Sequence, residues 1–476
     1  MKRPGELVEV EVESDPASTP ARNGPRRFDG PAPRRVLRTL SLLLAALVVL
    51  GLGTVLATDQ ERRAVDRDDA AVRRASALDG TVASLRLPVT EQWRLDGRFV
   101  GAAGGLVLVE EGEPAQLVAR TTEGAVAWRI PLPGSRAGAL TCPRALEVGG
   151  LLVCEVEALE ITAPNTGAAL VQQAGRLLVL RAADGSVRAG WPLARGTVGW
   201  DVLEDQDVVV ARRSGGEVVV RRLHPGARSA VWTVVVPVPD GASSRQPSVE
   251  VRRGRVLLSG SLALAVRADG HVSGPWAPRA GTAAVDLLPV DGGVVVWQES
   301  RRGEMHRDDG GVGPAVQGSP ARVPVDDGAP ADVLLLLDGT PDVVRAVDPA
   351  TGRTLWEHPA RASDLLVRID GLLVLAGQGA LRGVDVQTGE VRWRTPAGSP
   401  DSPLLQAVTD GVRLLVPDYE VTTGRRVAAL RLADGTRVWE APLPSGAWRF
   451  AVRGDAVVVG GGGGAAVLGP SEGGSA

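Results

Sequence analysis

A repeated pattern of about eleven residues constrains this chain more than any other feature of its sequence. Residues 346–356 read AVDPATGRTLW, which predicts a strand, a tight turn and a returning strand. Pro349 presets φ in the turn, and the Asp348 carboxylate is placed to cap it. Gly352 supplies the positive φ that closes the turn, and Trp356 follows four residues later in the returning strand.

Seven copies of this pattern occur between residues 118 and 439. They read VARTTEGAVAW, LRAADGSVRAGW, RRLHPGARSAVW, AVRADGHVSGPW, AVDPATGRTLW, GVDVQTGEVRW and ALRLADGTRVW. The second, third and fourth copies return over two additional residues. Every copy has one turn glycine, and these are Gly124, Gly185, Gly226, Gly270, Gly352, Gly389 and Gly435.

Composition agrees with an all-β repeat protein. Trp contributes 11 residues, against three Phe and one Tyr, which suits one large anchor per repeat better than an aromatic-rich core. The 60 Gly and 34 Pro stand mainly at turns between short Val/Leu runs. The net charge is −3 and no basic patch is present, so we expect no nucleic-acid partner.

The spacing of the repeats predicts a β-propeller. Successive pattern tryptophans are 63, 41, 44, 80, 37 and 46 residues apart, and a four-stranded blade takes about 40–50 residues. We attribute the first long interval to an insertion at Ile161–Ala169. In the second, a strand at Gly293–Gln298 precedes Arg301–Pro330, which is rich in Gly, Pro and Asp and predicts a long loop. A degenerate extra blade there is the alternative.

The two ends of the chain complete the expected ring. Glu91–Leu95 (EQWRL) resembles only the last strand of a blade, whereas Phe450–Val452, Asp455–Val459 and Ala465–Leu468 predict three strands that lack a fourth. Pairing the first strand with the last three removes an exposed edge. The expected fold is an all-β, eight-bladed propeller of four-stranded antiparallel blades, with seven or nine blades as alternatives, preceded by one transmembrane helix.

The N-terminal region predicts a membrane anchor. Residues 1–35 are rich in Pro, Arg, Gly and Glu and are expected to form a disordered cytoplasmic tail. Thr39–Thr58 carries no charge, and twenty helical residues span about 30 Å, so we expect a transmembrane helix at residues 36–58. A cleaved signal peptide ending at Val55–Ala57 is the rival, although such apolar regions usually run only about 7–15 residues.

Charges next to the apolar segment indicate its orientation. Arg34, Arg35 and Arg38 precede it, which favours a cytoplasmic N-terminus and an extracytoplasmic propeller in a single-pass protein of the cell membrane. We expect a charged helical stalk at residues 59–87, the propeller at 88–470 and a disordered tail at 471–476.

The two cysteines, Cys142 and Cys154, flank a predicted hairpin that turns at Gly149–Gly150. Strand pairing brings the two flanks within reach of a disulfide if the register allows it. Two free buried thiols are the alternative, but an exported chain favours the bond.

The blade endings resemble the PQQ-like (quinoprotein-type) β-propeller repeat, over about Pro88–Leu468. The resemblance implies that each tryptophan near the end of an outer strand packs between neighbouring blades, close to a turn glycine. It implies this role for Trp93, Trp128, Trp191, Trp232, Trp276, Trp356, Trp393 and Trp439. The chain is most similar to the membrane-anchored PQQ-like propeller proteins of high-GC Gram-positive bacteria.

Two branches of that family differ in function. Quinoprotein dehydrogenases bind pyrroloquinoline quinone and Ca²⁺ on the propeller axis and have an adjacent Cys–Cys pair, which this sequence lacks. The scaffold lipoprotein of the outer-membrane β-barrel assembly machinery has no catalytic role. We expect no cofactor, no metal and no catalytic residue in this chain.

Few other residues suggest chemistry. Trp200, Trp297 and Trp448 lie outside the pattern and are candidates for a ligand surface, although burial within a blade is the commoner fate. Gly460–Gly464 predicts a flexible loop between strands, because a short strand and not a helix follows it. No G-x-S-x-G motif occurs.

The four histidines show no metal-ligand spacing. They are His224, His271, His306 and His358. Glu304, Asp308 and Asp309 near His306 allow at most a loose cation site in the predicted loop.

We therefore expect a non-catalytic binding or scaffold module for an envelope protein or glycan. Ile161–Ala169 and Arg301–Pro330 are the expected contact regions, and deletion of the second is expected to leave folding intact. An enzyme resembling the PQQ-dependent dehydrogenases is the alternative. A sensor is a weaker one, since residues 1–35 contain nothing that resembles a kinase or a DNA-binding motif.

Overall fold

The computed structural model divides the chain into two units, Met1–Asp66 and Arg67–Ala476. Of the first unit it describes residues 62–66, which are helical. No described helix is long and apolar enough to cross a membrane, and the predicted span at 36–58 lies outside the described residues. The residues described are 62–75, 78, 81–82, 84–103, 105–132, 140–146, 150–162, 169–194, 196–203, 205–227, 229–238, 248–276, 285–298, 302–329, 332–339, 342–377, 379–396, 408–420, 424–444, 447–453, 456–461 and 464–471.

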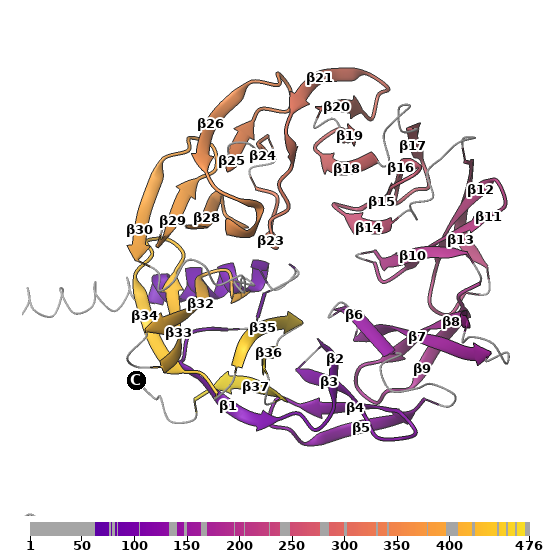
Figure 1. Cartoon of the computed structure of the whole chain (residues 1–476), viewed down its shortest axis with the longest axis horizontal. Coiled ribbons are helices and arrows are strands. Elements are labelled where there is room, and N and C mark those ends of the chain that lie inside the picture. Colours follow the sequence, from indigo (N-terminus) through magenta and orange to yellow (C-terminus); the bar gives the residue numbers. More distant parts are fainter. Residues whose placement is uncertain are drawn as a thin grey trace, which may run out of the picture. The chain divides into compact units, whose positions relative to one another are not determined.

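In the second unit, small antiparallel sheets are arranged around a circle (Figure 1). The described strands form nine such sheets, which we number as blades 1–9 in chain order. In each blade the innermost strand comes first in the sequence and the others follow outward, as in a β-propeller. Blade 9 is the exception, because its outermost strand is β1.

Blades 1–5 each contain four consecutive strands. Blade 1 has β2 (Arg98–Ala103), β3 (Leu106–Glu111), β4 (Gln116–Thr121) and β5 (Val126–Pro131); blade 2 has β6 (Leu140–Leu146), β7 (Leu151–Thr162), β8 (Ala169–Arg181) and β9 (Val187–Pro192); blade 3 has β10 (Thr197–Val202), β11 (Val208–Ser214), β12 (Glu217–Leu223) and β13 (Ala230–Pro237); blade 4 has β14 (Ser248–Arg252), β15 (Arg255–Ser259), β16 (Ala263–Arg267) and β17 (Val272–Trp276); blade 5 has β18 (Val285–Val290), β19 (Gly293–Gln298), β20 (Arg302–Arg307) and β21 (Val312–Gln317).

Blades 6–9 include the exceptions to this simple order. Blade 6 has β22 (Ser319–Pro320), β24 (Leu334–Gly339), β25 (Asp342–Val347) and β26 (Thr354–Pro359); blade 7 has β23 (Val325–Asp326), β27 (Leu365–Ile369), β28 (Leu372–Gly377), β29 (Ala380–Asp385) and β30 (Val391–Pro396), with the short 3-10 helix η1 (Ala362–Asp364) before β27; blade 8 has β31 (Val408–Thr409), β32 (Arg413–Glu420), β33 (Gly424–Arg431) and β34 (Arg437–Pro442); blade 9 has β35 (Ala447–Arg453), β36 (Ala456–Gly461), β37 (Gly464–Pro470) and β1 (Val89–Arg94).

The hydrophobic core lies between adjacent blades. Middle strands are covered on both faces, so they are nearly continuous apolar runs such as LLVLAG in β28, whose residues are almost all buried. Outer strands such as β30 (VRWRTP) bury mainly their tryptophan. One core cluster joins Leu415 of blade 8 to Val459 of blade 9, which shows how each seam holds two sheets together.

The described strands form nine blades, so the expected eight is wrong and the alternative of nine is confirmed. The error lies in Arg301–Pro330, which was predicted to be a loop. This range contains β20, β21, β22 and β23, and β18–β21 form the degenerate extra blade. The tryptophan repeat does not reveal blade 5, because the last strand of this blade, VGPAVQ, has Pro314 and no tryptophan.

The predicted closure of the ring is confirmed. Strand β1 pairs antiparallel with β37, and Trp93 lies opposite Val467. Blade 9 therefore combines strands from both ends of the propeller, and β1 covers the edge that β37 would otherwise expose. The loop predicted at Gly460–Gly464 is too long, because Gly460 and Gly461 belong to β36 and Gly464 begins β37; Gly462 and Gly463, between the two strands, lie outside the described residues.

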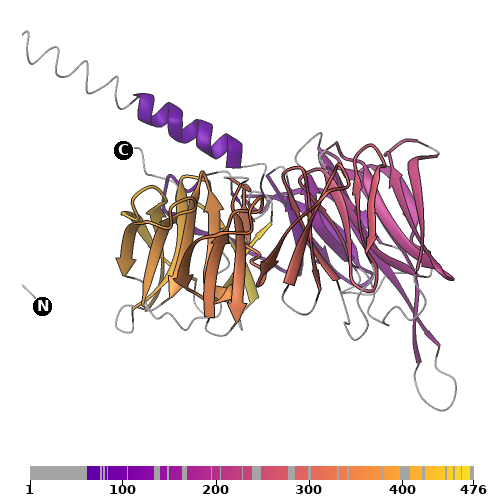
Figure 2. The same cartoon turned by 90° about the horizontal axis from the view of Figure 1, so that it is seen from above.

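The insertion predicted at Ile161–Ala169 extends one hairpin. Strands β7 and β8 run for 12 and 13 residues and stay paired out to Thr162 and Ala169. This hairpin projects beyond its neighbours, as Figure 2 shows. It leaves the ring on the face that carries the turns between second and third strands of the blades, which we call the hairpin face. The turns between first and second and between third and fourth strands make the opposite, turn face.

Two short segments add parallel partners to inner strands. Strand β23 pairs with β27, and Thr81 forms an isolated parallel bridge with Thr409. Arg368 of β27 is buried and donates to the carbonyls of Ala329 and Val333, both at 3.0 Å, so the chain around β23 is fixed to blade 7. The innermost edges of blades 7 and 8 are thus covered by chain from elsewhere.

The extra blade predicts opposite results for two deletions. Replacement of residues 302–317 with a short Gly/Ser linker should prevent cooperative folding, because it removes two strands and exposes the apolar faces of blades 4 and 6. Removal of residues 163–168 at the tip of the β7–β8 hairpin should leave the unfolding transition nearly unchanged. Circular dichroism during heating compares the two, and a folded 302–317 variant would contradict the blade assignment.

Candidate functional site: seams and turn face of the propeller

Tryptophan side chains tie neighbouring blades together. In six seams of the described ring, an indole Nε1 donates a hydrogen bond to a backbone carbonyl of the next blade. The bonds are Trp93–Thr122 (2.9 Å), Trp128–Ala182 (2.7 Å), Trp232–Ala268 (3.0 Å), Trp356–Val386 (2.7 Å), Trp393–Leu432 (2.8 Å) and Trp439–Leu85 (2.8 Å). Five acceptors directly follow a third strand. Leu85 replaces this acceptor in blade 9, where the chain ends take the place of the turn.

The turn glycines are needed for contact as well as for the turn. A Cβ atom on Gly124 would lie 2.9 Å from Cγ of Trp93, and one on Gly185 would lie 2.7 Å from Cε3 of Trp128. Both glycines have positive φ, at 89° and 68°. Gly270, Gly389 and Gly435 meet Trp232, Trp356 and Trp393 in the same way. Only glycine lets the indole approach the turn so closely.

The seam between blades 5 and 6 uses a different solution. Here Gly352 faces Pro314, whose Cβ would lie 3.1 Å from an added Cβ. Trp297 of β19 is buried and donates from Nε1 to the Gly318 carbonyl at 2.7 Å. Trp297 therefore packs within the protein and does not form a ligand surface.

The contact between an indole and the turn glycine of the next blade, which we call the wedge, is missing at two seams, although the tryptophans there pack against the apolar clusters between the blades. Trp191 and Trp276 are only partly buried, and a Cβ on Gly226 or Gly310 would meet nothing within 4 Å. A pocket of about 450 Å³ opens between blades 2 and 3. A second of about 470 Å³ lies beside blades 4 and 5. Both pockets are lined by residues of the turn face, next to the two seams where the wedge is missing.

Two arginines and a histidine line the pocket between blades 2 and 3, namely Arg181, Arg188 and His224. Arg181 pairs with Asp184 at 3.1 Å, and His224 Nδ1 lies 2.6 Å from Asp207. Arg188 has no acidic partner among the described residues.

The pocket beside blades 4 and 5 is balanced in charge. Arg255 donates two hydrogen bonds to Asp308, at 2.8 and 2.6 Å, and these bonds hold the pKa of Asp308 below its ordinary value. Arg267 pairs with Asp269 at 3.3 Å. Because each cation has an anion beside it, these side chains serve mainly to fix the turns.

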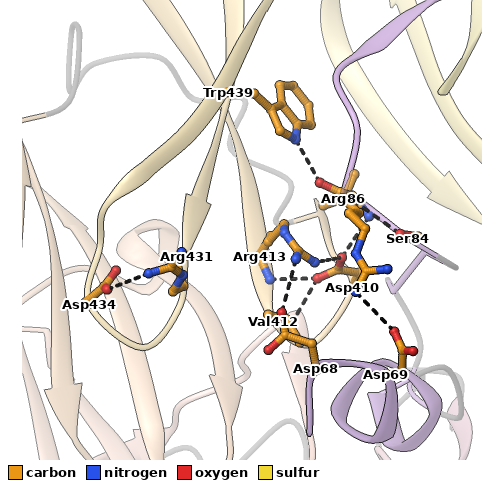
Figure 3. A network of polar contacts seen from close by, with 11 residues as sticks. Asp68, Asp69, Ser84, Arg86, Asp410, Val412, Arg413, Arg431, Asp434 and Trp439 are labelled. Atoms are coloured by element: carbon orange, nitrogen blue, oxygen red, sulfur yellow. Dashed lines mark hydrogen bonds and ion pairs between the residues drawn. The ribbon is translucent and has the colours of Figure 1, made fainter. Parts of the chain in front are cut away.

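A buried carboxylate fastens the chain before β1 to blade 8 (Figure 3). Asp410, in the turn after β31, is fully buried and accepts hydrogen bonds from the backbone N–H groups of Leu85 (2.7 Å), Val412 (2.9 Å) and Arg413 (2.6 Å). The Arg413 guanidinium bonds to Asp410 at 3.1 Å and reaches Asp68 at 3.2 Å. One charged group thus joins the turn, the segment before β1 and the helix that contains Asp68.

Further contacts extend this attachment. Arg86 lies 3.5 Å from Asp69, and Thr81 Oγ1 donates to the Ala75 carbonyl at 2.9 Å. Ala75 is buried beside Gly411. The described residues within 67–88, which we call the docked segment, therefore pack against blades 8 and 9.

The predicted disulfide is present. Cys142 of β6 and Cys154 of β7 are bonded and buried at the base of the β7–β8 hairpin. Next to it, Glu155 accepts a 2.6 Å hydrogen bond from Nε1 of Trp200 in blade 3. Trp200 therefore links two blades. The side chain of Trp448 lies outside the described residues.

No metal site is assembled in the described part of the chain, where no group of three His, Cys, Asp or Glu side chains is placed to hold an ion. Glu304 and His306 lie on β20, and Asp308 and Asp309 follow it, so the loop expected to carry a loose cation site is a strand and a tight turn. The His306 ring stands 5.1 Å from that of Trp276, and burial lowers the pKa of this histidine.

Residues 279–467 match a protein family described as outer membrane protein assembly factor BamB. This match covers less than half of the chain. Together with the fold, it supports the interpretation of the chain as a PQQ-like propeller repeat protein. No curated protein sequence matches the chain.

Solved structures similar to this chain include one protein that is named as an enzyme and one that is not. BamB from Moraxella catarrhalis is 16% identical, with 80% of this chain and 100% of that chain covered and a TM-score of 0.41. The quinohemoprotein alcohol dehydrogenase ADHIIG from Pseudomonas putida HK5 is 13% identical, with 80% and 75% covered and a TM-score of 0.38. At these values neither assigns an activity to this chain.

The wedge tryptophans predict unequal costs of substitution. Trp393→Ala should lower the free energy of unfolding by about 3–5 kcal/mol, because a buried indole and its hydrogen bond are lost. Trp191→Ala should cost clearly less, since its side chain is partly exposed and no turn glycine packs on it. Urea unfolding measures both, and equal losses would contradict the proposed difference between seams.

Asp410 predicts a local effect on the docked segment. Asp410→Ala leaves the buried Arg413 without its nearest carboxylate, and breaking a buried pair in this way typically costs about 3–5 kcal/mol. Amide hydrogen exchange in residues 81–86 should accelerate strongly. Asp434→Ala, in an exposed turn of the same blade, is the control. Unchanged exchange in residues 81–86 would show that Asp410 does not hold this segment.

Proposed function

We propose that this chain is a membrane-anchored, extracytoplasmic scaffold that binds an envelope protein without catalysing a reaction. The projecting β7–β8 hairpin carries the proposal. Its strands are about twice as long as those of the other blades, and their pairing continues to Thr162 and Ala169. A hairpin that extends beyond its sheet offers backbone and side chains to a partner on a firm base.

The base of the hairpin is unusually well braced. The Cys142–Cys154 disulfide joins its first strand to β6, and Trp200 binds Glu155 from the neighbouring blade. Bracing of this kind limits the motion that a partner would have to suppress on binding. The disulfide also supports an oxidising location outside the cytoplasm.

The docked segment and the hairpin lie on opposite faces of the propeller. The docked segment lies on the turn face, where Asp68 meets Arg413 and Ala75 meets Gly411. The hairpin leaves from the hairpin face, so the docked segment does not cover it and a partner has access to it.

Trimming the hairpin tests this proposal. In the variant, residues 158–173 are replaced by an Asn-Gly turn, so that the pairing ends at Val156 and Arg176. We expect normal thermal unfolding but loss of partner capture, measured by photocrosslinking in intact cells from a probe at position 176. A probe at Gly215, in the short β11–β12 turn of the same face, is the control. Capture of the same envelope protein by trimmed and full hairpins would refute the role of the hairpin.

A further inference from the structure

Strand β13 is the outermost strand of blade 3, and its outer edge pairs with no other described strand. It reads AVWTVVVP and has eight residues, whereas the outer strands of the other blades have five or six. An outermost strand offers a row of backbone N–H and C=O groups to any strand that approaches it.

The other outer strands carry devices that discourage such pairing. Charged side chains and internal prolines block the approach of another strand. They are Arg129 in β5, Arg188 in β9, Pro275 in β17, Pro314 in β21, Glu357 in β26, Arg392 and Arg394 in β30, Arg437 and Glu440 in β34, and Glu91 and Arg94 in β1. Among these nine strands, β13 alone has neither, since its proline is the terminal Pro237.

The exposed face of β13 is apolar. Val231 and Val235 are 53% and 51% exposed, and Thr233 between them is exposed as well. The alternate residues turn inward, where Trp232 and Val234 pack on the core of blades 3 and 4. The indole of Trp232 also bonds to Ala268, so the strand is held firmly in place while its outer edge stays free.

The sequence of this strand is complementary to itself. When two copies of β13 run antiparallel about Thr233, Val231 lies opposite Val235 of the other copy and Thr233 lies opposite Thr233. Val–Val and Thr–Thr pairs are favourable neighbours across strands. This register also leaves Pro237, which has no N–H group, outside the paired stretch.

We propose that two copies of this chain associate through antiparallel pairing of β13, which joins the two third blades into one eight-stranded sheet. The contact is isologous, because both copies use the same strand, so the assembly is complete with two copies. Each copy then covers the unprotected β13 edge of the other. An open edge of this length and polarity otherwise favours uncontrolled association.

Nearby charges do not oppose the pairing. Arg221 of β12 lies opposite Thr233 and shares its exposed face. In the dimer, the two copies of Arg221 are three strand spacings apart, about 14 Å. This distance exceeds the Debye length of about 8 Å at physiological ionic strength, so their repulsion is largely screened.

Single cysteines test both the pairing and its register. The chain has two cysteines and both are in the disulfide, so an introduced thiol is the only one that reacts. Thr233→Cys in the full chain should give a disulfide-linked dimer under mild oxidation, because opposite residues in antiparallel strands lie about 4.5–5.5 Å apart. Val187→Cys, on the exposed part of β9, is the control and should remain monomeric on a non-reducing gel.

Mixtures define the register independently. Val231→Cys alone should not crosslink, since the two copies of residue 231 would be about 14 Å apart along the strands. An equal mixture of Val231→Cys and Val235→Cys chains should crosslink to about half the yield of Thr233→Cys, because about half of randomly paired dimers contain one chain of each kind. The unoxidised protein should have the mass of a dimer by light scattering at micromolar concentration, and Val235→Lys should raise the dissociation constant at least about tenfold.

Several outcomes would overturn the proposal. A monomeric mass at all concentrations would do so, as would equal crosslinking of Thr233→Cys and Val187→Cys. Crosslinking of Val231→Cys alone would show a different register. Species larger than a dimer that Val235→Lys does not abolish would show that the copies meet through another surface.

Discussion

The indole-to-carbonyl hydrogen bond across six of the nine described seams is the interaction on which the rest of the structure depends. A propeller blade buries its faces only against its neighbours, so the ring requires a device that fixes the angle between consecutive sheets. Here a tryptophan on the outer strand of one blade reaches the chain just after the third strand of the next. The bond satisfies the buried N–H, and the ring of the indole fills the space above a glycine. Each such tryptophan therefore provides both apolar contact and a hydrogen bond that fixes the angle between two blades.

Departures from this rule account for the uneven surface of the ring. Where Trp191 and Trp276 do not meet the turn glycine of the next blade, pockets lie on the turn face, and arginine side chains line them. At the seam between blades 5 and 6, Pro314 stands in place of the outer-strand tryptophan. Trp297, on the second strand of blade 5, is the buried tryptophan at this seam. The fold tolerates these substitutions because each seam is only one of nine, and its neighbours keep the curvature of the ring.

The repeat made the propeller predictable from the sequence, including the closure of β1 on β37, because glycine and tryptophan spacing are local signals. The disulfide was predictable because a hairpin with Gly149–Gly150 at its turn brings Cys142 and Cys154 together. Blade 5 was not predictable, because its last strand, VGPAVQ, contains no tryptophan. Its second strand, with VVVW, was predicted, but the third, with GEMH, stands among Gly and Asp residues that indicate a loop. The attachment through Asp410 and Arg413 was also hidden: it joins residues more than 300 positions apart, and no local pattern marks a carboxylate that will be buried.

The docked segment has a mechanical consequence. Tension applied to the chain ahead of residue 67 meets the bonds of Asp68, Thr81 and Leu85 to blade 8 before it reaches β1. The load is therefore taken up by Asp410, Arg413 and Trp439, which lie in an adjacent sheet. The pairing of β1 with β37, which completes blade 9, would bear this load only after those bonds had broken.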